Sequence, residues 1–235
     1  MVYTVAMDDS RSKLSRRDAL LLSLSAPVAW KLSGCTSEPE VPADAGAMVQ
    51  VDAGAPPASC DPTESDALGP FFEAGAPERA RIASPDEPGE LLVLAGQRVL
   101  APECGTPLAD HVIDFWQADA GGEYFGAVDS DFRLRGQIRT SDEGRFELQT
   151  IMPGRYATSA GLRPAHIHLR VWTPEGVDRL VTQLYFEGDP YLYPNDGCGP
   201  PTCDSGDPAR ILALSPTTLE GAPAQRAEVR LVLAT

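Results

Sequence analysis

The chain has 235 residues, 43% of them hydrophobic, and a formal net charge of −15 at pH 7. This acidity disfavours nucleic acid and anionic lipid as partners, because both need a basic patch. No lysine follows Lys31, which excludes Schiff-base chemistry and lysine general bases from the rest of the chain. The 22 prolines and 21 glycines disfavour long helices and favour a turn-rich fold.

The first 34 residues resemble an export signal. Arg16 and Arg17 form a twin-arginine pair, and the apolar run that follows, Ala19–Trp30, is too short to span a bilayer comfortably. The sequence LSGC ends at Cys35 and resembles a bacterial lipobox, which would make Cys35 the lipidated first residue of the mature protein. We therefore expect an exported bacterial lipoprotein, periplasmic or on the cell surface, with this anchor as its only membrane contact. A buried amphipathic N-terminal helix is the alternative, although Pro27 fits a helix poorly.

Residues 35–62 are rich in Pro, Ala, Gly and acidic residues, which predicts a disordered tether. Four cysteines remain after Cys35, an even number that suits disulfides in an oxidising compartment. Cys198 and Cys203 lie in one Gly/Pro-rich loop that a short disulfide would hold, and Cys60 would then pair with Cys104 by elimination. Three connectivities remain open. Neither pair has metal-ligand spacing with a histidine nearby, so no structural zinc site is expected.

From residue 91 onward, short apolar or alternating runs recur between turn signals. This spacing predicts one all-β domain over residues 63–235, an antiparallel β-sandwich of about eight strands with long loops and little helix. The sequence SDEGR at 141–145 is predicted to form a hairpin turn between two of these strands. The predicted strands are Leu91–Leu100, Val112–Ala118, Leu134–Thr140, Arg145–Thr150, His166–Trp172, Arg179–Phe186, Ala209–Leu214 and Ala227–Ala234.

The strand His166–Trp172 contains two of the three histidines in the chain. His166 and His168 share one face because side chains alternate along a strand, and Ile167 and Leu169 lie on the opposite, core-facing side. Two imidazoles on one face can bind a single metal ion. Strand histidines are also common as surface or hydrogen-bonded core residues, so this pattern alone does not decide between metal and packing.

No acidic residue stands in a distinctive motif with this histidine pair, which disfavours a 2-His-1-carboxylate centre. His111 has no companion residue and is expected to be structural, which disfavours a zinc hydrolase. Tyrosine is the remaining hard ligand, since phenolate oxygen prefers a highly charged ion such as Fe(III). The candidates are Tyr124, in WQADAGGEYF, and Tyr156, in TIMPGRYA. Taken alone, Tyr156 fits better as a tyrosine corner that fixes a loop.

Several separated stretches combine into a more specific pattern: ESDALGPFFEAGAPERARI, LRGQIRTSDEGRFELQTIMPGRY, LRPAHIHLRV and LVTQLYFEGDPYL. In this order, over about residues 63–191, they resemble the intradiol ring-cleavage dioxygenases. These are non-haem Fe(III) enzymes that open catechols between the two hydroxyl-bearing carbons. The domain is most similar to the single catalytic domain of protocatechuate 3,4-dioxygenase subunits, because we find no counterpart of the helical dimerisation segment of catechol 1,2-dioxygenases.

The resemblance implies that one Fe(III) per chain is bound by four side chains. Tyr156 and His168 would be the axial ligands, and Tyr124 and His166 the equatorial ligands. Tyr156 would also act as a base that takes a proton from the catechol. The expected reaction inserts both atoms of O2 into the ring and ends in a cis,cis-muconate-type diacid.

The resemblance also assigns residues around the iron. Arg163 would stabilise the negative charge that develops on the substrate ring, and Gln183 would lie beside the site as a further catalytic residue. Gly69 and Pro70 would line the substrate pocket. The expected partners are a small catechol and O2, and an oligomer is left open. Two alternatives remain: a non-catalytic exported module that binds iron or a catechol, and a structural sandwich in which the tyrosines and histidines only pack.

Overall fold

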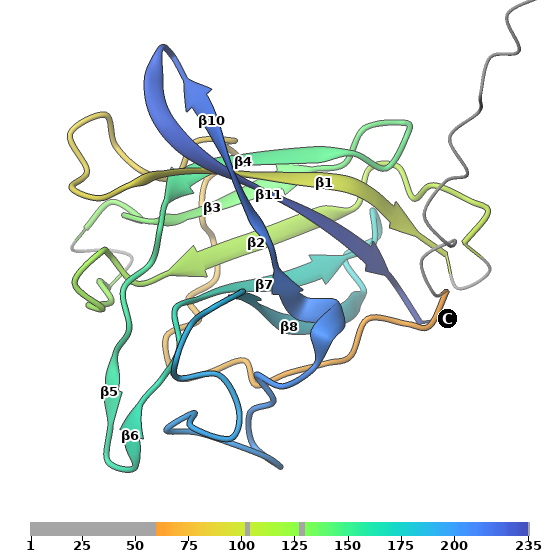
Figure 1. The fold of residues 1–235 in the computed structure, drawn as a ribbon. Helices are drawn as coiled ribbons and strands as arrows, with labels where there is room; N and C mark the ends of the chain where they lie inside the picture. The colour runs from red at the N-terminus through yellow and green to blue at the C-terminus, as the bar shows by residue number, and fades with distance from the viewer. Residues whose placement is uncertain (1–59, 102–103, 127–129, 235) are drawn as a thin grey trace, which may run out of the picture. The chain divides into compact units, whose positions relative to one another are not determined.

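The computed structural model describes residues 60–101, 104–126 and 130–234, in which two β-sheets pack face to face (Figure 1). The predicted export signal, Cys35 and most of the predicted tether lie outside the described residues. The only helical element in the described ranges is a 3₁₀ turn, η1 (Pro208–Arg210), so no helix there could cross a membrane. The prediction of an all-β sandwich is confirmed.

The first sheet has the strand order β10-β11-β1-β4. Strand β11 runs parallel to β1, whereas the β1–β4 and β10–β11 pairs are antiparallel, so the sandwich is not wholly antiparallel. The strands are β1 (Leu91–Leu100), β4 (Phe146–Ile151), β10 (Leu214–Leu219) and β11 (Ala222–Val232).

The second sheet has the strand order β3-β2-β7-β8-β9, and its β8–β9 pair is also parallel. A separate two-stranded hairpin, β5–β6, extends beyond the sheets (Figure 1). The strands are β2 (Val112–Gln117), β3 (Arg135–Arg139), β5 (Ala157–Thr158), β6 (Gly161–Leu162), β7 (His166–Trp172), β8 (Asp178–Phe186) and β9 (Ile211–Leu212).

The core lies between the two sheets. It is made by apolar side chains, which alternate along the strands with side chains on the outer faces. Leu94 of β1 and Leu148 of β4 face Phe115 of β2 and Leu169 of β7, and all four side chains are buried. Strand β7 contributes Ile167 as well, as its alternation predicts. The same alternation turns the histidines of β7 to the outer face of the second sheet.

The SDEGR turn forms, but the prediction that it joins a hairpin is wrong. Strand β3 pairs with β2 in one sheet, and β4 pairs with β1 in the other. The turn docks on β1 instead, where the Val99 N–H donates to the Gly144 carbonyl oxygen at 2.8 Å. Gly144 has φ +69, and a Cβ there would lie 2.7 Å from the Val99 carbonyl oxygen, so this contact requires glycine.

The C-terminal part also differs from the prediction. Residues 208–210 form the 3₁₀ turn, with Asp207 as its N-cap and Arg210 buried in ion pairs. Of the predicted strand Ala209–Leu214, only the two residues of β9 therefore form a strand before β10 begins. A long hairpin, β10–β11, then completes the first sheet, and the predicted strand Ala227–Ala234 is the second half of β11.

The segment before β1 is fixed to the end of β11. The Thr63 N–H donates to the Val232 carbonyl oxygen at 2.9 Å, and the Val232 N–H donates to Thr63 Oγ1 at 3.0 Å. A disulfide joins Cys60 to Cys104 just beyond β1. The two ends of the sandwich therefore lie side by side (Figure 1).

Candidate metal centre

Strand β7 presents His166 and His168 on the outer face of the second sheet. In the sheet register, His166 lies opposite Tyr185 of β8, and His168 lies between Trp116 of β2 and Gln183 of β8. Both imidazoles are buried, with ring centroids 4.9 Å apart. The structure therefore brings the predicted pair of histidines together at a covered point on the sheet.

Tyr156 reaches this point from the β5–β6 hairpin. Tyr156 directly precedes β5 and Arg163 directly follows β6, and the Arg163 N–H donates to the Tyr156 carbonyl oxygen at 2.9 Å. The ring centroids of Tyr156 and His166 lie 5.6 Å apart. The short chain between Tyr156 and β7 is thus a hairpin that holds Tyr156 and Arg163 side by side.

Tyr124 approaches from the loop after β2. Its phenolic oxygen lies 3.4 Å from Nε2 of His166, and its ring centroid lies 5.6 Å from that of Tyr156. Gly122 has φ +87, and a Cβ there would lie 2.1 Å from the Arg155 carbonyl oxygen. Gly122, the second glycine of GGEY, therefore allows the loop of Tyr124 to pack on the segment of Tyr156.

The ionisation states of these side chains fit a metal cation. His166 donates its Nδ1 proton to the Pro164 carbonyl oxygen at 2.6 Å, which leaves the lone pair of Nε2 on the side of Tyr124. Burial lowers the pKa of His166 to about 4 and the pKa of His168 well below its usual range, so both rings are in the neutral form that binds metals. Burial and the neighbouring Tyr156 raise the pKa of Tyr124, a shift that a bound cation would oppose.

The set of donors indicates which metal fits. The described parts of the chain contain no group of three or more His, Cys, Asp or Glu side chains that could hold a metal ion. The rings of Tyr124 and Tyr156 lie beside the two buried imidazoles instead. Phenolate oxygen suits a hard, highly charged ion, and Fe(III) is the one that fits this mixture of oxygen and nitrogen ligands.

Comparison with known proteins identifies the family. A family model described as Dioxygenase matches residues 68–198, more than half of the chain. The chain belongs to the intradiol ring-cleavage dioxygenase family. It is 35% identical to a chlorocatechol 1,2-dioxygenase of Rhodococcus opacus over 159 residues, which cover 58% of this chain and 60% of the relative. It is 40% identical to a protocatechuate 3,4-dioxygenase beta chain of Burkholderia cepacia over 114 residues, or 44% of this chain and 48% of that one.

Solved structures agree with this assignment to the intradiol dioxygenases. The 3-chlorocatechol 1,2-dioxygenase of Rhodococcus opacus 1CP aligns with a TM-score of 0.64 and 32% identity, covering 74% of this chain and 73% of that one. A dioxygenase domain from a Streptomyces dioxygenase–carbohydrate-binding fusion protein aligns with a TM-score of 0.59 and 32% identity, covering 74% and 99%. The chain spans about half the length of the curated relatives it matches.

Gly69 and Pro70, predicted to line the substrate pocket, both line a cavity, and Gly69 also lies close to a histidine. They line a cavity of about 290 Å³ together with Tyr156 and Arg163. Gly69 has φ +73, and a Cβ on it would lie 3.1 Å from Cε1 of His168. A larger cavity of about 510 Å³ contains none of the predicted site residues in its lining.

Arg163 lies at the centre of a buried polar network. Its guanidinium donates through Nε to Asp196 at 3.1 Å and through Nη2 to the Tyr185 hydroxyl at 3.1 Å, and its Nη1 lies 3.5 Å from Nε2 of His166. The side chains of Arg163 and Asp196 are only 2% and 1% exposed. Burial alone would lower the pKa of Arg163, but the hydrogen bond to Asp196 and the nearby Tyr185 raise it, so the group stays charged.

Gln183 is completely buried opposite His168, and its side-chain contacts are to protein groups. Its Nε2 donates to the Ala67 carbonyl oxygen at 2.7 Å, and its Oε1 lies 3.1 Å from the Tyr185 hydroxyl oxygen. The bond to Ala67 fixes the segment before β1 against the sheet. These contacts show how Gln183 is positioned beside His168, and its catalytic role stays a prediction.

Five further residues of the site are absent from the sequence-based list. Phe71 stacks on Tyr124 with centroids 4.1 Å apart, and Trp116 stacks on His168 at 4.8 Å. The strand register could have revealed Trp116, and the position of Phe71 directly after Gly-Pro was a further signal. The other three belong to the Arg163 network and are Tyr185, Asp66 and Asp196.

The four cysteines that follow Cys35 form two disulfides. Cys60 pairs with Cys104 and Cys198 with Cys203, which is the pairing reached by elimination. Cys198 and Cys203 also line the cavity beside Tyr156, a position that the sequence did not indicate.

Proposed function

We propose that the chain is a non-haem Fe(III) intradiol dioxygenase that cleaves a catechol between its two hydroxyl-bearing carbons. Both atoms of one O2 enter the substrate, and the product is a cis,cis-muconate-type diacid. The observation that carries the proposal is the convergence of two tyrosines and two buried neutral histidines beside a cavity and a charged arginine. The ligands would be Tyr124, Tyr156, His166 and His168, with one iron per chain.

The protein surroundings would orient the metal ligands. Iron, when bound, would supply the Lewis acid that holds the catechol as a dianion and makes its ring reactive toward O2. Stacking on Trp116 and contact with Gly69 hold the His168 ring in one orientation. Stacking on Phe71 does the same for Tyr124. These contacts fix the ligands without using their donor atoms.

Two side chains would handle charge and protons on the substrate. The phenolic oxygen of Tyr156, which lines the cavity, would accept a proton from a catechol hydroxyl. The guanidinium of Arg163, held in the same wall, would stabilise negative charge that develops on the ring. Such a fixed, buried cation acts more strongly than it would in water.

Iron loading and oxygen uptake test the proposal together. Iron-loaded protein should show a visible tyrosinate-to-Fe(III) charge-transfer band and should consume O2 with at least one member of a catechol panel. Tyr124→Phe and Tyr156→Phe should each weaken or shift this band, whereas Tyr193→Phe, at an exposed position, should leave it unchanged. Binding of catechols without O2 uptake would favour the non-catalytic binding module. Absence of the band after ferric loading would contradict the metal site.

We further propose that the protein is exported and anchored through a lipid on Cys35. The two disulfides support an oxidising compartment, because such bonds persist there. In the native bacterium, Cys35→Ala should move the protein from the membrane fraction to the soluble fraction. Membrane association that survives this substitution would contradict the anchor.

A further inference from the structure

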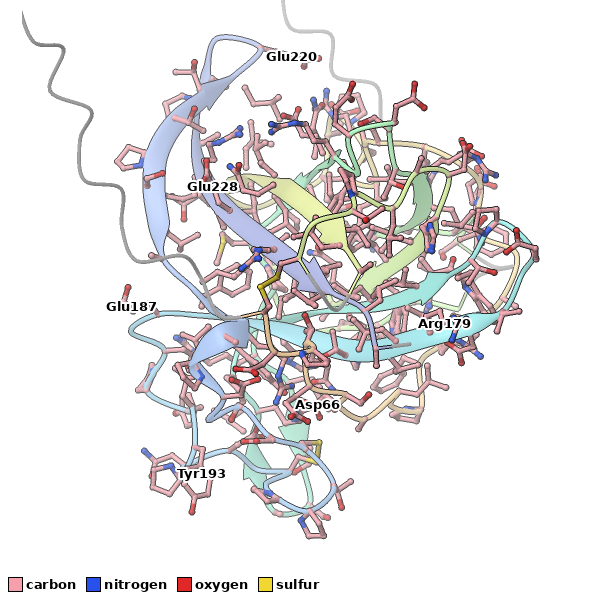
Figure 2. The ribbon with its side chains drawn as sticks, turned by 90° about the vertical axis from the view of Figure 1, so that its right-hand side faces the viewer. Asp66, Arg179, Glu187, Tyr193, Glu220 and Glu228 are labelled. Carbon is pink, nitrogen blue, oxygen red and sulfur yellow. A yellow bond between two sulfur atoms is a disulfide. The ribbon has the colours of Figure 1, made fainter. Side chains whose placement is uncertain are left out.

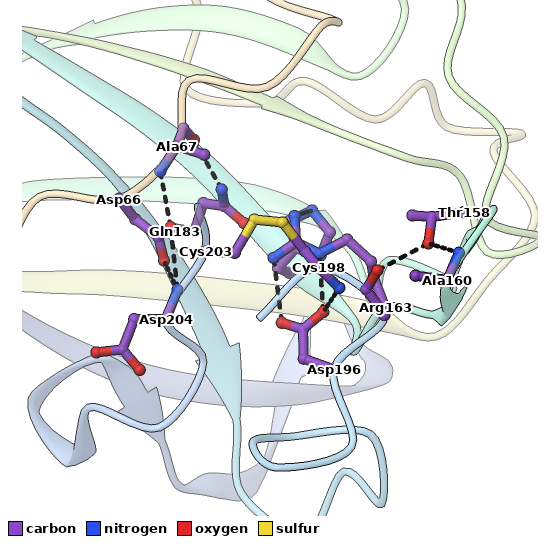
Figure 3. Close-up of a disulfide and its surroundings, with 12 residues drawn as sticks. Asp66, Ala67, Thr158, Ala160, Arg163, Gln183, Asp196, Cys198, Cys203 and Asp204 are labelled. Atoms are coloured by element: carbon purple, nitrogen blue, oxygen red, sulfur yellow. Dashed lines mark hydrogen bonds and ion pairs between the residues drawn. A yellow bond between two sulfur atoms is a disulfide. The ribbon is translucent and has the colours of Figure 1, made fainter. Parts of the chain in front are cut away.

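The cavity beside Tyr156 has the Cys198–Cys203 disulfide in its wall. One side is formed by Gly69 and Pro70, and another by Gly197, Cys198 and Cys203. Figure 3 shows this disulfide directly next to Arg163 and Asp196. A catechol held near Tyr156 in this cavity would therefore lie against the disulfide loop, residues 196–204.

The disulfide loop is tied to the site at both of its ends. Before the disulfide, the Asp196 carboxylate accepts from Nε of Arg163 at 3.1 Å and from the Cys198 N–H at 2.9 Å. After the disulfide, the Asp204 N–H donates to the Asp66 carboxylate at 3.3 Å. Asp66 in turn accepts from the Tyr185 hydroxyl at 2.8 Å. Figure 3 shows the Arg163–Asp196 contact before the disulfide and the Asp66–Asp204 contact after it. Through Tyr185, which contacts both Arg163 and Asp66, both ends of the loop join one network.

The same loop also packs on the β5–β6 hairpin. Thr158 Oγ1 donates to the Gly197 carbonyl oxygen at 2.8 Å, and the Gly197 N–H donates to the Leu162 carbonyl oxygen at 2.9 Å. A Cβ on Gly197 would lie 2.5 Å from the Gly161 carbonyl oxygen. The hairpin that carries Tyr156 and Arg163 is therefore in direct backbone contact with the disulfide loop.

Between its tied ends, the loop is held across its tip by the disulfide and by the N–H groups of Thr202 and Cys203, which donate to the Gly199 carbonyl oxygen at 3.2 and 3.0 Å. It contains Gly199, Pro200 and Pro201, and no described helix or strand falls within it. If the loop moved, Arg163 would lose its carboxylate partner while remaining buried. An unpaired buried charge is unfavourable, so the arginine would leave its position.

We propose that Asp196 is a positioning residue for Arg163 and that the Cys198–Cys203 disulfide holds Asp196, and with it the cavity wall, in place for catalysis. This inference rests on the proposed function. It assigns the short disulfide to the working of the site, and the Cys60–Cys104 disulfide to the stability of the fold.

The two disulfides make a matched pair for the test. Cys60 and Cys104 are 44 residues apart in sequence, whereas Cys198 and Cys203 are only 5 apart. Because a disulfide that closes a longer loop restricts the unfolded chain more, Cys60–Cys104 should contribute more to global stability. A purely structural role for both disulfides therefore predicts the larger loss of activity and stability for the Cys60–Cys104 variant.

The first experiment compares C198S/C203S with C60S/C104S in the iron-loaded protein. We expect C198S/C203S to lower kcat by about tenfold to a hundredfold, with a small fall in Tm, because a displaced catalytic group costs this much. C60S/C104S should lower Tm more and leave kcat nearly unchanged. Equal loss of kcat in both variants, or none in C198S/C203S, would overturn the inference.

Asp196→Asn tests the ion pair without breaking the disulfide. It should lower kcat by about tenfold with little change in KM, because Arg163 acts on charge that develops after substrate binds and would lose the charged hydrogen bond that positions it. The matched control is Asp178→Asn, which removes the carboxylate from the solvent-exposed Arg170 pair and should leave kcat unchanged. An unchanged kcat in Asp196→Asn would contradict its positioning role.

A measurement that does not depend on turnover tests the cavity wall. Under anaerobic conditions, a water-soluble phosphine reduces each disulfide of the iron-loaded protein, and alkylation with mass spectrometry follows each rate. Catechol at about ten times its Kd should slow reduction of Cys198–Cys203 about tenfold, because only the free protein reacts. Reduction of Cys60–Cys104 should be unaffected. Equal rates of Cys198–Cys203 reduction with and without catechol would contradict a place for this disulfide in the wall of the catechol cavity.

The outcomes separate this inference from the proposed function. Wild-type protein that consumes no O2 with any catechol would contradict the proposed function. Wild-type protein that is active, with C198S/C203S and Asp196→Asn equally active, would contradict only the role of the disulfide loop.

Discussion

The outer faces of the two sheets carry polar side chains of different kinds. On the first sheet, Arg226 of β11 lies 3.8 Å from Glu147 and 3.8 Å from Glu228, and all three side chains are at least 35% exposed. On the second sheet, the Arg163–Asp196 pair is at most 2% exposed. Figure 2 shows Glu228 on the β10–β11 hairpin, on the other side of the sheets from Asp66.

This difference shows where a β-sandwich has been adapted for chemistry. Polar groups in water need no cover, and exposed ion pairs contribute little to stability. Buried polar groups are costly unless each finds a partner, so a sheet seldom buries them without a reason. Here the segment before β1 and the loop after β8 cover the polar face of the second sheet, through Asp66 and Asp196 among others. The covered polar face coincides with the candidate metal centre.

The strongest test of this comparison is His168→Ala on the covered face. We expect complete loss of the visible Fe(III) band and of O2 uptake, because the substitution removes a metal ligand. The control is His111→Asn, since His111 is the third histidine and lies outside the site, with its Nδ1 against the Ala109 carbonyl oxygen. An iron-loaded His168→Ala protein with an unchanged band would show that the centre lies elsewhere.

Arg210→Met should give the largest loss of stability. Arg210 is fully buried and paired with Asp66 and Asp207. Its removal leaves the Asp66 carboxylate buried without its cation, which should lower the free energy of unfolding by about 3–5 kcal/mol. Denaturant unfolding of the metal-free protein measures this change. A loss below about 1 kcal/mol would mean that the covered face tolerates unpaired charge.

Phe71→Leu should have an intermediate effect. The stacked pair of Phe71 and Tyr124 would be lost, at a cost of about 0.5–1.5 kcal/mol beyond the area of apolar surface. We expect a shifted tyrosinate-to-Fe(III) band together with this small loss of stability, since Tyr124 would be less firmly oriented. An unchanged spectrum would show that the loop of Tyr124 is held by its backbone contacts alone.

Arg226→Met on the exposed face should have the smallest effect. Its two ion pairs are 3.8 Å long and open to solvent, so the free energy of unfolding should change by less than about 0.5 kcal/mol. Oxygen uptake should stay at the wild-type rate. This variant makes the same change of residue as Arg210→Met, so a large effect here would remove the contrast between the two faces.

Local patterns in the sequence predicted where strands lie and which face of a strand is buried in the core. Alternation predicted β1 and β7 to the residue, and it separated the core face of β7 from the face of His166 and His168. It did not predict which strands pair. SDEGR was expected to join a hairpin, but the approach of Gly144 to Val99 sends the next strand to the other sheet.

In the candidate site, too, local motifs predicted some residues, whereas long-range contacts were not predicted. The residues that were named from motifs gather at the outer face of the second sheet, because each motif stands next to a strand or turn that fixes its place. Of these residues, Gly69, Pro70, Tyr156 and Arg163 also line the cavity. The supporting partners were missed, since Asp196 and Asp66 reach Arg163 and Tyr185 from distant, irregular segments. Nothing in the local composition of such segments encodes the long-range contact.

The hydrogen bonds between Thr63 and Val232 have a consequence for how this domain can be joined to others. Because the segment that enters the domain meets the end of β11, the domain can be inserted into a loop of a host protein without pulling the host's chain apart. The same adjacency makes circular permutation feasible, with a short linker between the present ends and new ends at the open turn around Gly176.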